Sequence, residues 1–63
     1  MPNRFAELKR ALFDWGADYI EEFLGYEYPH DEDKDVTENR LDMAYDDMPD
    51  KLLEEFYEKF NIA

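Results

Sequence analysis

The chain has 63 residues and a formal net charge of −11, because eighteen acidic side chains oppose seven basic ones. It contains no cysteine, which excludes a disulfide and a thiolate metal site. Hydrophobic residues make up 44% of the chain and aromatic residues 17%, more than an acidic disordered segment carries. This composition predicts one small folded domain spanning residues 1–63.

The same charge restricts location and partners. No apolar run is long enough for a membrane span, and the first residues lack the apolar region of a signal peptide. We therefore expect a cytoplasmic protein that has no contact with a membrane. Its negative field should repel nucleic acid, so direct nucleic-acid binding is not expected, and it should attract a basic protein surface.

The first predicted helix runs from Arg4 to Leu24. Apolar side chains recur there at steps of three and four residues, as on the buried face of an amphipathic helix. The stripe expected in the core comprises Phe5, Leu8, Leu12, Trp15, Tyr19 and Phe23. Asn3 suits the N-cap and Gly25 suits a left-handed C-cap. Gly16, in the middle, indicates a close helix contact, a kink or a break into two shorter helices.

Two further helices are predicted after a loop at residues 26–35. The second runs from Val36 to about Asp47, with Asp35 as its N-cap and Glu38 completing a capping-box-like pair. The third runs from Pro49 to Phe60, because proline suits a first helical position. Its stripe comprises Leu52, Leu53, Phe56, Tyr57 and Phe60. Strand signals are absent, so the predicted fold is all-α, a small three-helix bundle.

Acidic residues recur at helical spacing in each predicted helix. The three acidic rows are Asp14, Asp18, Glu21 and Glu22; Glu38, Asp42 and Asp46; and Asp50, Glu54 and Glu58. Neighbours four residues apart lie about 5–6 Å apart at Cβ, a spacing comparable to that of successive phosphates on one nucleic-acid strand. Each row could therefore imitate phosphates, although charged helix faces are also commonly just solvated.

Acids in the predicted loop and nearby tyrosines extend the candidate surface, because aromatic rings stack on arginine side chains. The residues expected to contact a partner are Asp14, Asp18, Glu21, Glu22, Tyr26, Tyr28, Asp31, Glu32, Asp33, Asp35, Glu38, Asp42, Tyr45 and Asp46. Interspersed lysines would favour the fold more, and in the third predicted helix Glu55 and Lys59 have the spacing of such a pair.

Few residues in this chain could take part in catalysis. Thr37 and His30 are its only threonine and histidine, there is no serine, and two glycines cannot form a phosphate-binding loop. We expect neither an enzyme nor a cofactor. Asp31, Asp33 and Asp35 match the first positions of a calcium-binding EF-hand loop, with Asp42 at the twelfth. Val36 replaces the required glycine, so the favoured interpretation is a loop kept soluble by its charge, and weak binding of calcium or magnesium is the alternative.

In size, acidity and helicity the chain resembles small inhibitors that phages and mobile elements direct against bacterial defence, namely anti-CRISPR and DNA-mimic anti-restriction proteins. This resemblance implies an inhibitor that occupies the DNA- or guide-binding surface of a nuclease. A local sequence, Tyr26-Glu27-Tyr28-Pro29, is similar to the Tyr-Tyr-Pro motif of colicin-nuclease immunity proteins. That likeness implies that Tyr26 and Tyr28 are anchor residues.

Three functions remain open from the sequence. The favoured one is a non-enzymatic inhibitor that binds the basic nucleic-acid-binding surface of a target by phosphate mimicry. The alternatives are a helical homodimer that serves assembly and a weak metal-binding regulator that uses residues 31–35.

Overall fold

The computed structural model describes residues 3–62, so residues 1, 2 and 63 of the predicted domain lie outside the described part. Within residues 3–62 there are four helices and no strand. They are α1 (Arg4–Trp15), α2 (Ala17–Leu24), α3 (Lys34–Asp47) and α4 (Asp50–Lys59). The all-α class is confirmed. The predicted number of helices is wrong, because the segment expected to form one long helix forms two.

Gly16 separates α1 from α2. Its backbone has φ 116° and ψ 178°, a conformation that is essentially restricted to glycine. The Gly16 N–H donates to the Leu12 carbonyl at 3.0 Å, and the Gly16 carbonyl accepts from the Ile20 N–H at 3.3 Å. A Cβ built on Gly16 would meet nothing within 4 Å. Of the three roles considered for this glycine, the structure therefore shows the break and no close contact.

Local signals placed two helix ends correctly and two incorrectly. One of the errors is at α4, which begins at Asp50, so that Pro49 is its N-cap and not its first helical residue. The Asn3 side chain accepts hydrogen bonds from the N–H groups of Phe5 and Ala6, and Gly25 has the left-handed conformation at φ 81°. The start of α3 lies two residues earlier than predicted, with Asp33 rather than Asp35 at the N-cap. The reason is that the Asp33 carbonyl already accepts the N–H groups of residues 36 and 37.

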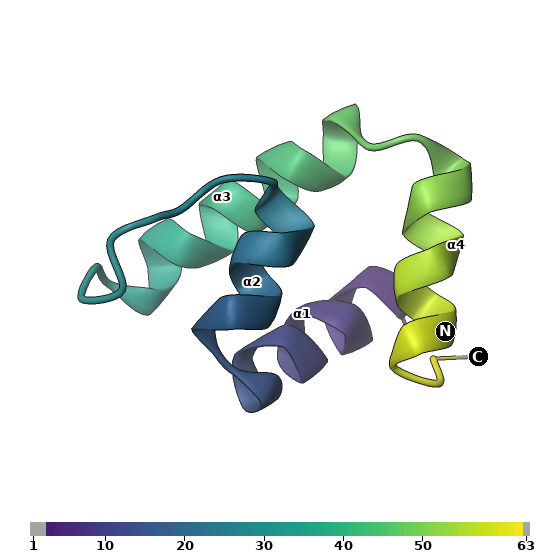
Figure 1. Ribbon diagram of the computed structural model, residues 1–63, viewed down its shortest axis with the longest axis horizontal. Helices are drawn as coiled ribbons and strands as arrows, with labels where there is room; N and C mark the ends of the chain where they lie inside the picture. The colour runs from purple at the N-terminus through teal and green to yellow at the C-terminus, as the bar shows by residue number, and fades with distance from the viewer. Residues whose placement is uncertain (1–2, 63) are drawn as a thin grey trace.

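The helices α1 and α3 run in opposite directions past one another (Figure 1). The Lys34 ammonium, at the start of α3, lies 5.1 Å from the ring centroid of Phe13, near the end of α1. At the other end Tyr45 stacks on Phe5, with ring centroids 4.0 Å apart. The fourth helix lies beside the first turn of α1, because the Arg4 guanidinium sits over the Tyr57 ring at 4.1 Å.

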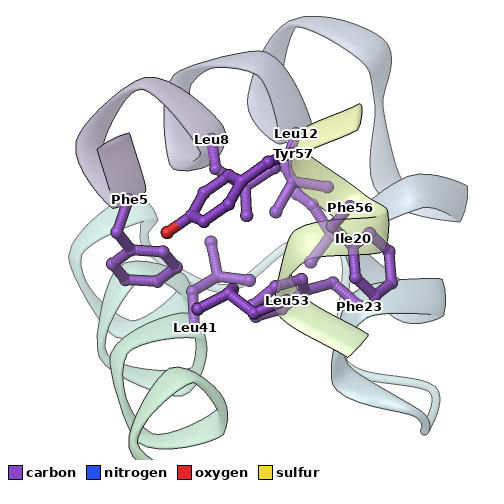
Figure 2. Close-up of a cluster of buried hydrophobic side chains, with 9 residues drawn as sticks. All are labelled: Phe5, Leu8, Leu12, Ile20, Phe23, Leu41, Leu53, Phe56 and Tyr57. Carbon is purple, nitrogen blue, oxygen red and sulfur yellow. The ribbon is translucent and has the colours of Figure 1, made fainter. Parts of the chain in front are cut away.

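Side chains from all four helices converge on one core (Figure 2). Its members are Phe5, Leu8 and Leu12 of α1, Ile20 and Phe23 of α2, Leu41 of α3, and Leu53, Phe56 and Tyr57 of α4. Leu41 is the only residue of α3 in this cluster, and it is fully buried. Ala44 of α3 packs against the cluster as a partly buried side chain, so Leu41 is the central but not the sole apolar contact of this helix.

Trp15 was predicted in the core and is 63% exposed, so that expectation is wrong. Had residues 4–24 formed one helix, Trp15 would have continued the stripe of Leu12 and Tyr19. The break at Gly16 changes the direction of the chain directly after it. Trp15 is thus left at the open end of α1, outside the core.

Candidate protein-binding surface

Each of the three predicted acidic rows contains a member bound by a basic side chain from another helix. Lys9 of α1 contacts Asp42 of α3 at 3.0 Å. Arg4 of α1 donates two hydrogen bonds to Glu54 of α4, at 2.9 and 3.2 Å. Lys59 of α4 binds Glu22 of α2.

These ion pairs change the view of the rows as phosphate mimics. Arg4, Lys9 and Lys59 each pair with a carboxylate of another helix, so every row contains a carboxylate that is already paired. The pairs join helices distant in sequence, although exposed pairs of this kind contribute little to stability, because water and salt screen them. The uncompensated negative charge is on those carboxylates of each row that have no ion pair.

The segment between α2 and α3 is fastened to α3 through Arg40. Its guanidinium donates to both carboxylate oxygens of Glu32, at 2.6 and 3.1 Å, and to the Tyr26 hydroxyl at 3.4 Å. The buried Thr37 hydroxyl also donates to Glu32, at 3.1 Å. Hydrogen bonds from these donors, of which Arg40 has the larger effect, hold the pKa of Glu32 below its ordinary value. Tyr26 and Glu32 thus serve the fold, whatever they contact outside it.

The same segment is fastened to α2 through Glu21. This carboxylate accepts the Tyr28 backbone N–H at 3.3 Å and lies 2.9 Å from Nε2 of His30. The rings of Tyr28 and His30 lie 4.9 Å apart at their centroids. The hydrogen bond to Glu21 raises the pKa of His30 above 6.5, and the same bond lowers the pKa of Glu21.

We expect the stability of the domain to depend on pH through His30. Because its folded-state pKa is raised, its contribution is fully present below pH 6.5 and is lost as the pH rises through the folded-state pKa. Thermal unfolding of the parent and His30→Gln proteins between about pH 5 and pH 8 measures this. The difference in melting temperature should be largest at the acidic end and disappear at the alkaline end. A difference that does not vary with pH would contradict the assignment, and Glu21→Gln should remove the dependence.

The remaining predicted contact residues have no ion pair within residues 3–62. Tyr45 is used in the stack on Phe5. The acids belong to three parts of the chain: the junction of α1 and α2, the segment that leads into α3, and α3 itself. In that order they are Asp14 and Asp18; Asp31 and Asp33; and Asp35, Glu38 and Asp46.

The EF-hand-like loop considered for residues 31–42 is not formed. From Lys34 onward this segment is α3, so the liganding positions of a twelve-residue loop do not converge. Among the described residues, no group of three His, Cys, Asp or Glu side chains is arranged to hold a metal ion. The structure therefore lends no geometric support to the metal-binding alternative.

A surface that was not predicted from the sequence lies where α2 and α4 meet. Trp15, Tyr19 and Phe60 form three mutual edge-to-face contacts, with ring centroids 5.3 to 5.9 Å apart. Beside them is a hollow of about 150 Å³, lined by Glu22, Leu52, Glu55, Phe56 and Lys59. We call this aromatic cluster and hollow the α2–α4 seam. Leu52 is 41% exposed within it.

One signal for this seam was present in the sequence. Adjacent Leu52 and Leu53 make the stripe of α4 too wide for a single small core, so one of the two has to lie at its border. The position of Trp15 depends on the break at Gly16. The helix-internal pair expected between Glu55 and Lys59 is not formed among the described residues, because Lys59 reaches across to Glu22.

Comparisons of the chain with protein-family models, curated proteins and solved structures found no match. Within the described residues, no helix combines the length and apolar character needed to cross a membrane.

Proposed function

We propose that the chain is a non-enzymatic binding protein that occupies the basic nucleic-acid-binding surface of a target and thereby excludes DNA or RNA. A nuclease of bacterial defence is the target class that the resemblance to phage-encoded inhibitors indicates. The observation that supports the proposal most directly is that most of the carboxylates have no ion pair. Five of the eighteen contact a basic side chain within residues 3–62, and the other thirteen have no ion pair there.

The thirteen carboxylates without an ion pair are costly to a domain of this size. All are exposed except Glu38, which is half-buried, so they repel one another across a small surface. The principal axes of the molecule extend over only 30 × 20 × 18 Å. Five ion pairs already join the helices and the connecting segment, and a sequence selected for stability alone would replace some of the other acids with lysine. A basic partner would turn this repulsion into attraction.

The positions of the acids favour a distributed field over a strict copy of a phosphate strand. Each row contains a carboxylate paired with a basic side chain, and the acids without an ion pair come from all four helices and from the segment between α2 and α3. Such a field accelerates association with a positively charged surface and sets its orientation, while apolar contacts determine how long the complex lasts. The proposed mechanism is therefore steering by charge followed by anchoring at an apolar contact.

A homodimeric assembly module is the second candidate, favoured by the 63% exposure of Trp15. An exposed tryptophan beside other aromatic rings is typical of a contact surface. Two copies would bring together two charges of −11, which opposes association at low salt. Sedimentation at low and high salt distinguishes the candidates, since a dimer held by the aromatic cluster should form more readily at high salt.

We predict that neutralising free acids weakens binding without harming the fold. The variant Asp31→Asn/Asp33→Asn/Asp46→Asn/Asp47→Asn removes four charges, none of which is used in an ion pair within residues 3–62. A partner is first isolated on the immobilised chain from a bacterial lysate at low salt. Its association rate with the variant should then fall about tenfold or more at low salt. The melting temperature should stay constant or rise.

The outcome that contradicts this prediction is an unchanged association rate with a fold that remains intact. The control is the parent protein in increasing salt. Screening by salt should reduce its association rate toward that of the variant, because both treatments weaken the same field.

A further inference from the structure

We propose that the α2–α4 seam is a receptor for one arginine or lysine side chain of the basic partner. This inference rests on the proposed function and adds the anchoring contact to it. The seam combines apolar side chains, two carboxylates and one exposed aromatic ring, Trp15, and the chain places one of its own ammonium groups there.

The hollow has the composition that a long cationic side chain requires. Leu52 and Phe56 supply apolar surface for an aliphatic stem, while Glu22 and Glu55 supply carboxylates for the charged head. Arginine and lysine side chains bind in this divided manner, with the stem on apolar surface and the head on polar groups. A neutral apolar side chain would leave Glu55, which has no ion pair among the described residues, without a partner.

Lys59 already binds at the seam in the way proposed for the partner's cationic side chain. Its ammonium binds Glu22 and lies 5.5 Å from the ring centroid of Tyr19 and 6.0 Å from that of Phe56. These are distances at which a cation is attracted by an aromatic face. Glu55 has no ion pair among the described residues, so a carboxylate of the hollow remains for a second cation. Lys59 and the incoming side chain also compete for Glu22.

The aromatic cluster extends the seam toward solvent. Trp15 is the most exposed ring among the large hydrophobic residues, at 63%, and it contacts both Tyr19 and Phe60. A planar guanidinium stacks well on such a ring. Asp14 and Asp18, which are next to Trp15 and Tyr19 in sequence, are exposed and have no ion pair within residues 3–62. The charge around the cluster therefore selects a cationic occupant over a second copy of this chain.

Competition with Lys59 gives a sharp test. The probe is a capped peptide of alternating arginine and alanine, and its affinity is measured by calorimetry at low salt. Lys59→Met keeps the aliphatic stem and frees Glu22. Lys9→Met is the matched control, because it makes the same change of charge and frees Asp42 in another row. We expect Lys59→Met to raise affinity up to about fivefold more than Lys9→Met does, the range for an exposed ion pair of up to ~1 kcal/mol.

Two further measurements accompany the comparison. Trp15 is the only tryptophan, so its fluorescence should change saturably as the peptide binds. Glu55→Gln should weaken binding more than Glu58→Gln, since Glu58 has the same charge on the same helix but does not line the hollow. A peptide with citrulline in place of arginine, which has a similar shape without the charge, should not bind.

The results that would contradict the proposal for the seam differ from those that would contradict the proposed function. Equal effects of the two lysine substitutions, or unchanged Trp15 fluorescence at saturation, would mean that the peptide binds through diffuse charge and that the seam is not its receptor. Citrulline binding as tight as arginine binding, or a dimer whose Trp15 fluorescence depends on protein concentration, would also overturn the seam. No binding of the arginine peptide to any variant at low salt would overturn both.

Discussion

Replacing Leu41 with alanine should remove most or all of the stability of this domain. Leu41 is fully buried and is the only residue of α3 in the core cluster. Truncation of a buried leucine to alanine costs about 2–5 kcal/mol, through lost burial and the cavity left behind. A core in a domain of this size rarely supplies more than about 3–5 kcal/mol. Urea unfolding followed by circular dichroism should therefore show Leu41→Ala partly or fully unfolded before denaturant is added.

Met43→Ala provides the matched control for Leu41→Ala. Met43 lies on the same helix and is 70% exposed, so its loss should change the free energy of unfolding by no more than about 0.5 kcal/mol. If Leu41→Ala is as stable as Met43→Ala, α3 does not depend on the core described for it.

Replacing Gly16 with alanine should have the second largest effect. At φ 116° and ψ 178° a side chain strains the backbone by about 1–3 kcal/mol, although the added methyl group itself meets no neighbour. In a domain of this length each kcal/mol lowers the melting temperature by about 4–8 °C. Thermal unfolding should thus show a clear loss of stability.

Gly25→Asn is the control for Gly16→Ala. Gly25 is left-handed at φ 81°, a conformation that asparagine tolerates, so the loss there should be small. If Gly16→Ala instead joins α1 to α2, helicity should rise and Trp15 fluorescence should shift to shorter wavelength, because Trp15 then returns to the buried stripe. An unchanged melting temperature with an unchanged spectrum would contradict the role given to Gly16.

The sequence predicted those parts of the fold that local rules determine. The N-cap at Asn3 and the left-handed cap at Gly25 are decided by the conformational preferences of one or two residues. The helical class follows from the period of the apolar side chains. The start of α3 was missed by two residues, because hydrogen bonds to the Asp33 carbonyl begin the helix before the stronger sequence signal at Asp35.

The outcome at Gly16 could not be decided from the sequence. A glycine within a helical pattern is compatible with a contact, a kink or a break, and the choice depends on how the two halves pack against α3 and α4. The exposure of Trp15 follows from that choice. For the same reason the α2–α4 seam, which brings residues of α1, α2 and α4 together, became visible only in three dimensions.

The acidic rows were predictable in position but not in pairing. Helical spacing places Asp42 in a row with its neighbours, yet its contact with Lys9 joins residues 33 positions apart in the chain. Likewise Lys59 binds Glu22 of another helix instead of Glu55 on its own. Such pairings depend on how the helices cross. They decide which carboxylates remain free for a partner.

Displacement of nucleic acid is the measurement that tests the central claim most directly. The isolated partner is loaded with a fluorescently labelled DNA or RNA strand and titrated with the chain at low salt. We predict that the strand is released as the chain binds, that release weakens as salt is added, and that the variant with four neutralised acids releases it poorly. A partner that holds the strand and the chain at the same time, with an affinity for the chain that salt does not change, would contradict the account.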